Sequence, residues 1–244
     1  QFLSPYTNHR KDEFGGSLEN RMRFMKLVVS KVMEEAKDDM AVVVKTNMYD
    51  GFRSGMQIDE CIKVAQELEK LGVHALVLTA GFVSKAPMEV MRGAMPLKTL
   101  AYYMDLKNFW WLKMGLHLGG RMVIPTVPYK DAYFYETAMK FRQALKMPLI
   151  YVGGMVKKED MEKVLDSGFT AFQMARALVR DTDFVNKLQS GEVTQSDCGH
   201  SNYCIGRMYT KEMKCHQCME KNQIPCKLQK EIEKAEDAVK KTNR

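Results

Sequence analysis

The sequences PLIYVGG at residues 148–154 and AFQMAR at residues 171–176 decide the fold. Each begins with a short apolar run that shows no alternation of apolar and polar residues, which is typical of a strand buried on both faces of a parallel sheet. Each ends in small or basic residues, where we expect the chain to turn into a helix. Gly153 and Gly154 allow the backbone to approach a ligand closely, and the N–H groups at the start of the next helix attract an anion. The alternative is that both glycines only form a turn.

The preceding sequence alternates helices and strands in the same way. Ser17 is typical of a helix N-cap, and apolar residues at helical spacing extend this helix to about Ala36. A second amphipathic helix covers 58–71 and ends at Gly72, which is typical of a C-cap. Further helices are predicted over 131–145, 157–167 and 181–188. The apolar runs predict four parallel strands, at 41–46, 75–79, 148–152 and 171–174.

Residues 81–129 interrupt this order. The segment contains both tryptophans and several prolines and glycines, and it is too long for a plain connection between a strand and a helix. We predict an insertion that is partly helical, with helix over about 98–114. Such insertions build lids and substrate pockets, and they also serve as stabilising additions or oligomer contacts. The charged stretch 227–244 is predicted to be an exposed or frayed helix.

These elements predict an α/β fold that is part of a (β/α)8 TIM barrel. A complete barrel takes about 250 residues before insertions, and much of this chain lies in the insertion and the C-terminal tail. The sequence therefore supports four strands rather than eight. We predict a partial barrel over 1–190 with its insertion at 81–129, followed by a cysteine-containing extension over 191–244. In a complete barrel, strands 7 and 8 form a phosphate site.

The composition is that of a globular protein, with 45% hydrophobic and 27% charged residues. No apolar run approaches the roughly 20 residues that cross a bilayer, so we expect no membrane partner. The net charge of +7 allows an anionic partner, but the interleaving of basic and acidic residues argues against a nucleic-acid surface. Six cysteines, one of them isolated at Cys61, do not form a secreted disulfide framework. We therefore expect a cytoplasmic protein in which Cys61 is an inert core thiol.

The opening sequence QFLSPYTNHRKDEFGGSLENR at residues 1–21 resembles the signature of the old yellow enzyme family. This family comprises FMN-dependent NAD(P)H:flavin oxidoreductases and includes 2,4-dienoyl-CoA reductase and trimethylamine dehydrogenase. Its signature follows strand 4 of the barrel, so the resemblance implies that the four predicted strands correspond to strands 5 to 8. It also implies that the chain, which begins at Gln1 without a methionine, is the C-terminal half of such a barrel with its extension.

The resemblance implies an FMN site at the ends of the strands. Lys45 would lie beside the flavin ring, where a cation stabilises the negative charge of reduced flavin. The alternative is a lysine that only extends from a strand end. Gly153, Gly154, Ala175 and Arg176 would hold the FMN phosphate, and the family commonly has glycine where this chain has Ala175. Arg176 would form paired hydrogen bonds with the phosphate oxygens, the alternative being an ordinary arginine at the start of a helix.

The family's substrate-anchoring residues and its proton-donating tyrosine lie upstream of the residues in this chain. No residue here takes these roles, so the catalytic residues are unknown and this fragment alone is expected to be inactive. His9 lies within the signature and is interpreted as a solvated loop histidine. NAD(P)H is expected to deliver hydride directly, because nothing in the tail resembles the nucleotide-binding domain of dienoyl-CoA reductases.

Cysteines in the tail form a candidate metal site. Iron–sulfur members of the family bind a [4Fe–4S] cluster through three closely spaced cysteines and a fourth about a dozen residues later. Cys198, Cys204 and Cys215 resemble this pattern, but Ser201 stands at the second position and serine is a poor iron ligand. Cys218 is a candidate replacement. The alternatives are a zinc site that uses cysteines with nearby histidines, and a degenerate cluster that binds nothing.

These expectations together describe an FMN-dependent NAD(P)H oxidoreductase of the ene-reductase type. Its partner would be a small electrophile, such as an activated alkene, and a homo-oligomer is compatible with the sequence. The first alternative is a flavoenzyme similar to tRNA-dihydrouridine synthases, which the charge and cysteines suggest and the opening signature opposes. The second is a non-catalytic half-barrel assembly module, whose exposed strand edges are closed by dimerisation.

Overall fold

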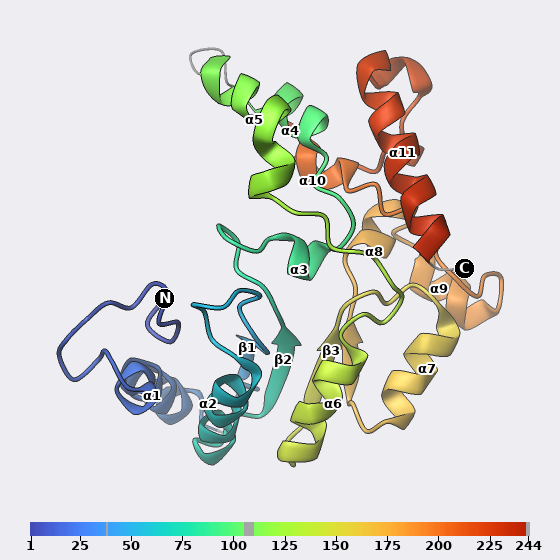
Figure 1. Ribbon diagram of the computed structural model, residues 1–244. Helices are drawn as coiled ribbons and strands as arrows, with labels where there is room; N and C mark the ends of the chain where they lie inside the picture. The colour runs from blue at the N-terminus through green and yellow to red at the C-terminus, as the bar shows by residue number, and fades with distance from the viewer. Residues whose placement is uncertain (38, 105–109, 243–244) are drawn as a thin grey trace. The chain divides into compact units, whose positions relative to one another are not determined.

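The computed structural model of the chain describes residues 1–37, 39–104 and 110–242 (Figure 1). The chain divides into two compact units. The first, which we call the sheet unit, consists of Gln1–Val90, Phe134–Gly153 and Glu162–Gln173. The second, which we call the helical unit, consists of Met91–Tyr133, Gly154–Met161 and Met174–Arg244. The sequence at 191–244 and most of that at 81–129 belong to the helical unit.

Four parallel strands form the centre of the sheet unit. They are β1 (Val43–Asn47), β2 (Ala75–Thr79), β3 (Leu149–Val152) and β4 (Ala171–Gln173), hydrogen-bonded in the order β1-β2-β3-β4. This confirms the four parallel strands predicted from the apolar runs. One row of paired residues crosses the sheet from Lys45 through Val77 and Ile150 to Ala171. Because the strands are parallel, their carboxyl ends lie along one edge of the sheet.

The first two helices of the sheet unit begin and end close to the predicted residues, whereas the helix predicted over 131–145 begins only at Tyr135. These helices are α1 (Leu18–Ala36), α2 (Ile58–Lys70) and α6 (Tyr135–Ala144), and α2 and α6 pack side by side (Figure 1). The hydroxyl of Ser17 accepts a hydrogen bond from the N–H of Asn20 at 3.3 Å, which confirms Ser17 as the N-cap. Gly72 follows the end of α2 with a φ of 83°, a conformation that favours glycine.

The connections between strands are those of a (β/α) barrel. Helix α2 connects β1 to β2, and α7 (Lys158–Asp166) connects β3 to β4. Between β2 and β3 the chain forms α3 (Met88–Met91), the rest of the insertion and then α6. In β2, Ala75, Leu76, Val77 and Leu78 are all buried, so this apolar run marks a strand covered on both faces, whereas β1, β3 and β4 are only partly buried. The fold class is therefore α/β, as a partial barrel.

The helical unit contains several short helices and two longer ones, α5 (Trp110–Val123) and α11 (Cys226–Thr242). The short ones are α4 (Leu97–Tyr103), α8 (Arg176–Arg180), α9 (Phe184–Ser190), α10 (Tyr203–Arg207), η1 (His216–Cys218) and η2 (Lys221–Gln223). The helix predicted over 98–114 is replaced by α4 and α5, and its part at 105–109 lies outside the described residues. The helix predicted from 181 begins at Phe184, because Asp181 is extended where it ends α8. Among the described helices, none is long and apolar enough to cross a membrane.

The final helix is packed rather than exposed or frayed, which corrects the expectation for 227–244. One face of α11 buries Leu228, Ile232 and Val239. Two of these join a hydrophobic cluster that consists of Tyr103, Tyr203, Ile224, Leu228 and Ile232. The hydroxyls of Tyr103 and Tyr203 are hydrogen-bonded at 2.7 Å, so the phenol groups satisfy each other inside this core. Most charged residues of α11 are exposed, whereas Glu231 and Glu236 contact other parts of the unit.

Candidate functional site

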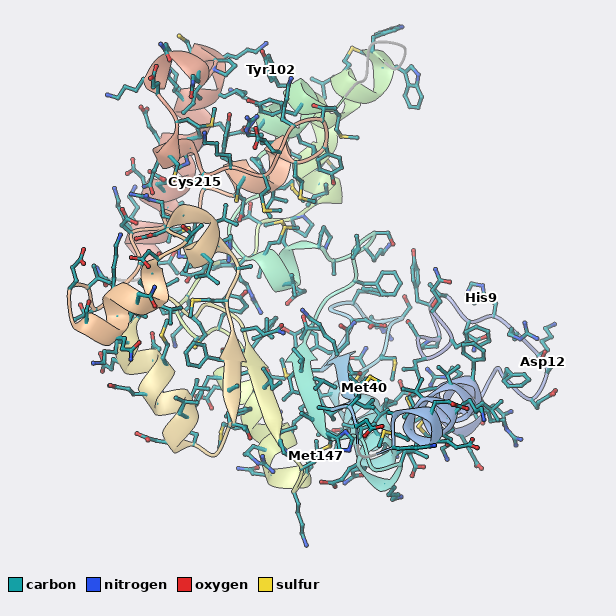
Figure 2. The ribbon with its side chains drawn as sticks, turned by 180° about the vertical axis from the view of Figure 1, so that it is seen from behind. His9, Asp12, Met40, Tyr102, Met147 and Cys215 are labelled. Atoms are coloured by element: carbon teal, nitrogen blue, oxygen red, sulfur yellow. The ribbon has the colours of Figure 1, made fainter. Side chains whose placement is uncertain are left out.

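The opening segment is fixed by a buried carboxylate that the sequence did not single out. Asp50 is 2% exposed, and its Oδ2 accepts hydrogen bonds from the hydroxyl of Ser4 at 2.7 Å and the N–H of Met56 at 2.8 Å. Asn47 at the end of β1 donates to Asp50 Oδ1 at 3.2 Å. The opening segment is therefore tied to the carboxyl end of the first strand. His9, in contrast, is exposed in the outer loop (Figure 2), as expected of a loop histidine.

Lys45 lines a cavity in the sheet unit. The cavity has a volume of about 220 Å³ and is bordered by residues of β1 and of the opening segment, including Ser4, Asn47 and Asp50. Lys45 itself is exposed on β1, where it is paired in register with Val77. Lys45 is the third of the five residues of β1, so its charge lies beside this cavity rather than at the last residue of the strand.

Both glycines after β3 have conformations that favour glycine. Gly153 has a φ of 127° and Gly154 a φ of 69°. A side chain on Gly154 would lie 2.8 Å from the backbone nitrogen of Ala132, and the Gly154 carbonyl accepts a hydrogen bond from that N–H at 3.2 Å. The turn itself therefore requires glycine at 154. The Tyr151 hydroxyl donates to the Gly153 carbonyl at 2.9 Å, which orients the end of the strand.

The helices that follow the strands offer fewer free N–H groups than the sequence suggested. The N–H of Lys158, at the start of α7, donates to the carbonyl of Thr194 at 2.9 Å. Helix α8, after β4, is only five residues long, with Ala175 at its N-cap and Arg176 as its first residue. The side chain of Arg176 is therefore the cationic group that directly follows Ala175 at the start of α8.

Arg176 is held by a residue that the sequence analysis missed. Its Nη1 donates to Oδ1 of Asn202 at 2.8 Å, and Asn202 is 2% exposed. The amide of Asn202 donates in turn to the carbonyls of Arg92 at 2.8 Å and Ala94 at 3.2 Å. No local signal marks this residue, because its partners lie 26 to 110 positions away in the sequence.

Aromatic rings surround the Arg176 guanidinium. Its central carbon lies 5.7 Å from the centre of the Tyr129 ring, and Tyr129 stacks on His200 at 3.9 Å. Burial lowers the pKa of His200 to about 3, and the positive charge of Arg176 acts in the same direction. Burial also raises the pKa of Tyr133, although Arg176 opposes that shift. The arginine is therefore a cation beside neutral rings.

This donor set fits a phosphate group. A guanidinium carries five N–H donors, of which one is donated to Asn202, and Tyr133 is a further hydrogen-bonding neighbour. Arginine forms paired hydrogen bonds with phosphate oxygens, and low-polarity surroundings strengthen them. Of the five proposed FMN ligands, Lys45 and Gly153 belong to the sheet unit, whereas Gly154, Ala175 and Arg176 belong to the helical unit.

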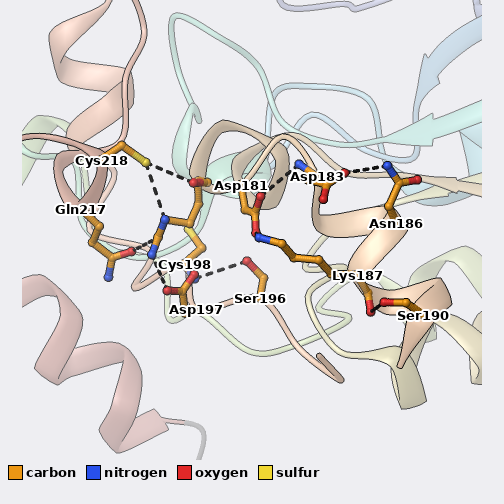
Figure 3. Close-up of polar contacts among 11 residues, drawn as sticks. Asp181, Asp183, Asn186, Lys187, Ser190, Ser196, Asp197, Cys198, Gln217 and Cys218 are labelled. Carbon is orange, nitrogen blue, oxygen red and sulfur yellow. Dashed lines mark hydrogen bonds and ion pairs between the residues drawn. The ribbon is translucent and has the colours of Figure 1, made fainter. Parts of the chain in front are cut away.

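Three of the four candidate cysteine ligands lie together in the helical unit. Cys198, Cys204 and Cys215 line one small cavity of about 10 Å³, the space of about one water molecule. Cys218 lies apart from that cavity, on the surface. Its thiol donates to the carbonyl of Arg180 at 3.1 Å, as Figure 3 shows beside Gln217 and Asp197.

The cysteine cluster does not fit an iron–sulfur cluster. Ser201 occupies the second ligand position and its hydroxyl lies 3.4 Å from Nδ1 of His216. Burial raises the pKa of Cys198, Cys204 and Cys215, to about 12 for Cys215. Across the ranges that the structure describes, no group of three or more His, Cys, Asp or Glu side chains is arranged to hold a metal ion. The [4Fe–4S] hypothesis is therefore not supported.

Comparisons with known proteins agree with this fold. Residues 1–114 match the NADH:flavin oxidoreductase / NADH oxidase family. The chain is 38% identical over 86% of its length to 4,4'-dithiodibutanoate disulfide reductase from Rhodococcus erythropolis. It is similar in structure to 2-naphthoyl-CoA reductase, with a TM-score of 0.63 and 20% identity, over 95% of this chain and 30% of that one. It is also similar to the old yellow enzyme homologue from Zymomonas mobilis, with a TM-score of 0.51 and 20% identity, over 80% of this chain and 44% of that one.

The chain belongs to the NADH:flavin oxidoreductase / NADH oxidase family, whose structural relatives include the old yellow enzyme homologues. It spans 51% of the length of the Rhodococcus erythropolis relative. The resemblance seen in the opening 21 residues is thus confirmed at the level of the family and of the fold.

Proposed function

We propose that this chain contributes the FMN-phosphate side of an NAD(P)H-dependent flavin oxidoreductase. The observation that carries the proposal is the hydrogen bond from Arg176 to the buried side chain of Asn202, which holds a cation shortly after β4. Family membership supports the choice of FMN as the anionic ligand. When bound, FMN supplies the hydride chemistry and NAD(P)H serves as its reductant.

The residues of this chain bind and tune the flavin. Arg176 pairs with phosphate oxygens, while the backbone at Gly153 and Gly154 provides a close approach. Lys45 places a positive charge where reduced flavin accumulates negative charge, which favours reduction. The cavity of about 220 Å³ beside Lys45 leaves space for part of a ligand.

An activated alkene or a related electrophile is the proposed hydride acceptor. An organic disulfide is a second candidate, because the relative with 38% identity is a disulfide reductase. No residue of this chain takes the substrate-anchoring role that the resemblance implies, so we expect the 244-residue chain alone to bind FMN without reducing alkenes. Steady-state NAD(P)H oxidation with an alkene or a disulfide, measured in the full-length protein, separates these substrate classes.

A titration of the purified chain with FMN tests the proposal. Quenching of flavin fluorescence should saturate, and Arg176→Ala should weaken binding by about 10- to 100-fold, the value of a hydrogen-bonded charge. Arg23→Ala serves as the control, because Arg23 is exposed on α1. Equal FMN affinity in the Arg176→Ala variant and the wild-type chain would contradict the proposed phosphate site.

A further inference from the structure

The helical unit contains a buried polar arrangement that the resemblance does not explain. Asn202 lies in the segment where cysteine spacing suggested a metal site, directly after Ser201. Asn202 is 2% exposed, and both the oxygen and the nitrogen of its side-chain amide are hydrogen-bonded. We propose that Asn202 is a positioning residue that fixes the Arg176 side chain for the FMN phosphate, an inference that rests on the proposed function.

The amide of Asn202 joins three segments of the helical unit. Its oxygen accepts from Arg176 Nη1 at 2.8 Å, and its nitrogen donates to the carbonyls of Arg92 and Ala94. The two carbonyls fix which end of the amide faces the arginine, because only the NH2 end can donate to them. The oxygen must then face the guanidinium. Asn202 therefore accepts from Arg176 in a defined orientation.

The backbone of this segment is adapted to present the amide. Asn202 has a φ of 58°, in the left-handed region that asparagine tolerates better than most residues, and it is the N-cap of α10. His200, two residues earlier, has a φ of 53° although it is not a glycine. Such conformations persist only where the surroundings over-determine them, and they concentrate at functional sites. The stack of His200 on Tyr129 supplies one such constraint.

A fixed arginine binds an anion more tightly than a mobile one. Ordering a free arginine side chain costs conformational entropy, and a contact made before the ligand arrives removes part of that cost from binding. Asn202 holds one N–H group of the guanidinium, while Tyr129 lies against its face at 5.7 Å. The remaining N–H groups are then presented in a constant direction.

The test compares FMN affinity in four forms of the 244-residue chain: wild type, Asn202→Gly, Arg176→Ala and the double variant. Glycine keeps the left-handed backbone and removes only the amide. We expect Asn202→Gly to weaken FMN binding by about tenfold, the value of one hydrogen bond to a charged group. Because Asn202 acts through Arg176, the same change should have no effect on FMN affinity in the Arg176→Ala background.

A second variant and a control keep the result interpretable. Asn202→Asp retains the accepting oxygen but places a carboxylate beside Arg176, so it should also weaken FMN binding by competing with the phosphate. Asn186→Ala removes an exposed amide from α9 in the same unit and should leave FMN affinity unchanged. The urea midpoint of each variant shows whether it is folded.

The outcomes separate this inference from the proposed function. Wild-type chain that does not bind FMN would contradict both. Wild-type chain that binds FMN, together with an Asn202→Gly variant that is folded and binds equally well, would contradict the inference alone. A loss of affinity on Asn202→Gly that persists undiminished in the Arg176→Ala background would show that Asn202 acts by another route, and it would also overturn the inference.

Discussion

Glu231 of α11 caps the N-terminus of helix α4, near Thr99. Its carboxylate accepts hydrogen bonds from the N–H groups of Lys98 and Thr99, each at 2.9 Å, and from the Thr99 hydroxyl at 2.9 Å. Helix α4 has no capping side chain of its own, because Pro96 is its N-cap. The tail thus supplies the cap of a helix in the insertion, which explains why both belong to one compact unit.

Replacing Glu231 should therefore destabilise the helical unit. Glu231→Ala leaves two N–H groups of α4 without their partner, and loss of a helix cap costs about 0.5–2 kcal/mol. Urea unfolding followed by circular dichroism measures the change. Glu233→Ala is the control, since Glu233 is exposed on the same helix. Equal losses of stability in both variants would contradict the capping role.

Gly154 should not tolerate a side chain. Gly154→Ala forces a residue with a φ of 69° to carry a Cβ that would lie 2.8 Å from the Ala132 nitrogen. Such strain costs on the order of 1–3 kcal/mol of folding free energy, measured by denaturant unfolding. Gly115→Ala on α5 is the matched control, because open space surrounds that position. It should leave stability unchanged or raise it by up to about 1 kcal/mol. A Gly154→Ala variant as stable as wild type would refute the backbone argument.

The six cysteines should react in two groups. Cys218 and Cys226 are exposed, whereas Cys61 and Cys215 are buried and Cys198 and Cys204 are half-buried. Burial raises the pKa of the last four thiols, so little reactive thiolate forms at neutral pH. Titration with a chromogenic disulfide reagent should show two fast thiols in the native chain, and all six only in denaturant. Rapid reaction of four or more thiols in the native chain would contradict the burial of this thiol cluster.

His200 should make the chain acid-sensitive. Its folded pKa of about 3 lies below the ordinary value of 6.5, so the unfolded chain binds a proton that the folded chain does not. The contribution of neutral His200 to the free energy of unfolding is fully present above pH 6.5. It falls as the pH drops toward about 3, by up to about 1.4 kcal/mol per pH unit. Unfolding free energies measured along this range test the slope. In the His200→Asn variant, whose asparagine suits the left-handed backbone, the unfolding free energy should depend less steeply on pH. An unchanged pH dependence would show that a group other than His200 causes the acid sensitivity.

Much of the sheet unit could be predicted because its signals are local. The buried strands are continuous apolar runs, and Ser17 and Gly72 mark helix ends through their own side chain or backbone. The packing of α11 also had a signal, since Leu228, Ile232 and Val239 lie on one face at helical spacing. The charged residues between them led to the wrong prediction of an exposed helix.

The arrangement around Arg176 could not be predicted because its partners are distant in sequence. The spacing of Cys198, Cys204 and Cys215 resembles the iron–sulfur pattern of the family, and these three residues line one cavity. It gave no indication that Asn202, within that spacing, contacts Arg176 or the carbonyl of Arg92. Pairings of this kind depend on how separate elements pack, so only the folded chain reveals them. The roles of Lys45 and Arg176 toward FMN remain predictions.

The most direct test of the central claim compares FMN with riboflavin, which has the same ring but no phosphate. Calorimetric titration of the wild-type chain should show one FMN site whose affinity exceeds that for riboflavin by at least about tenfold, as expected for a phosphate bound by a fixed arginine. Equal affinities for the two flavins, or no binding of FMN, would contradict the phosphate site at Arg176.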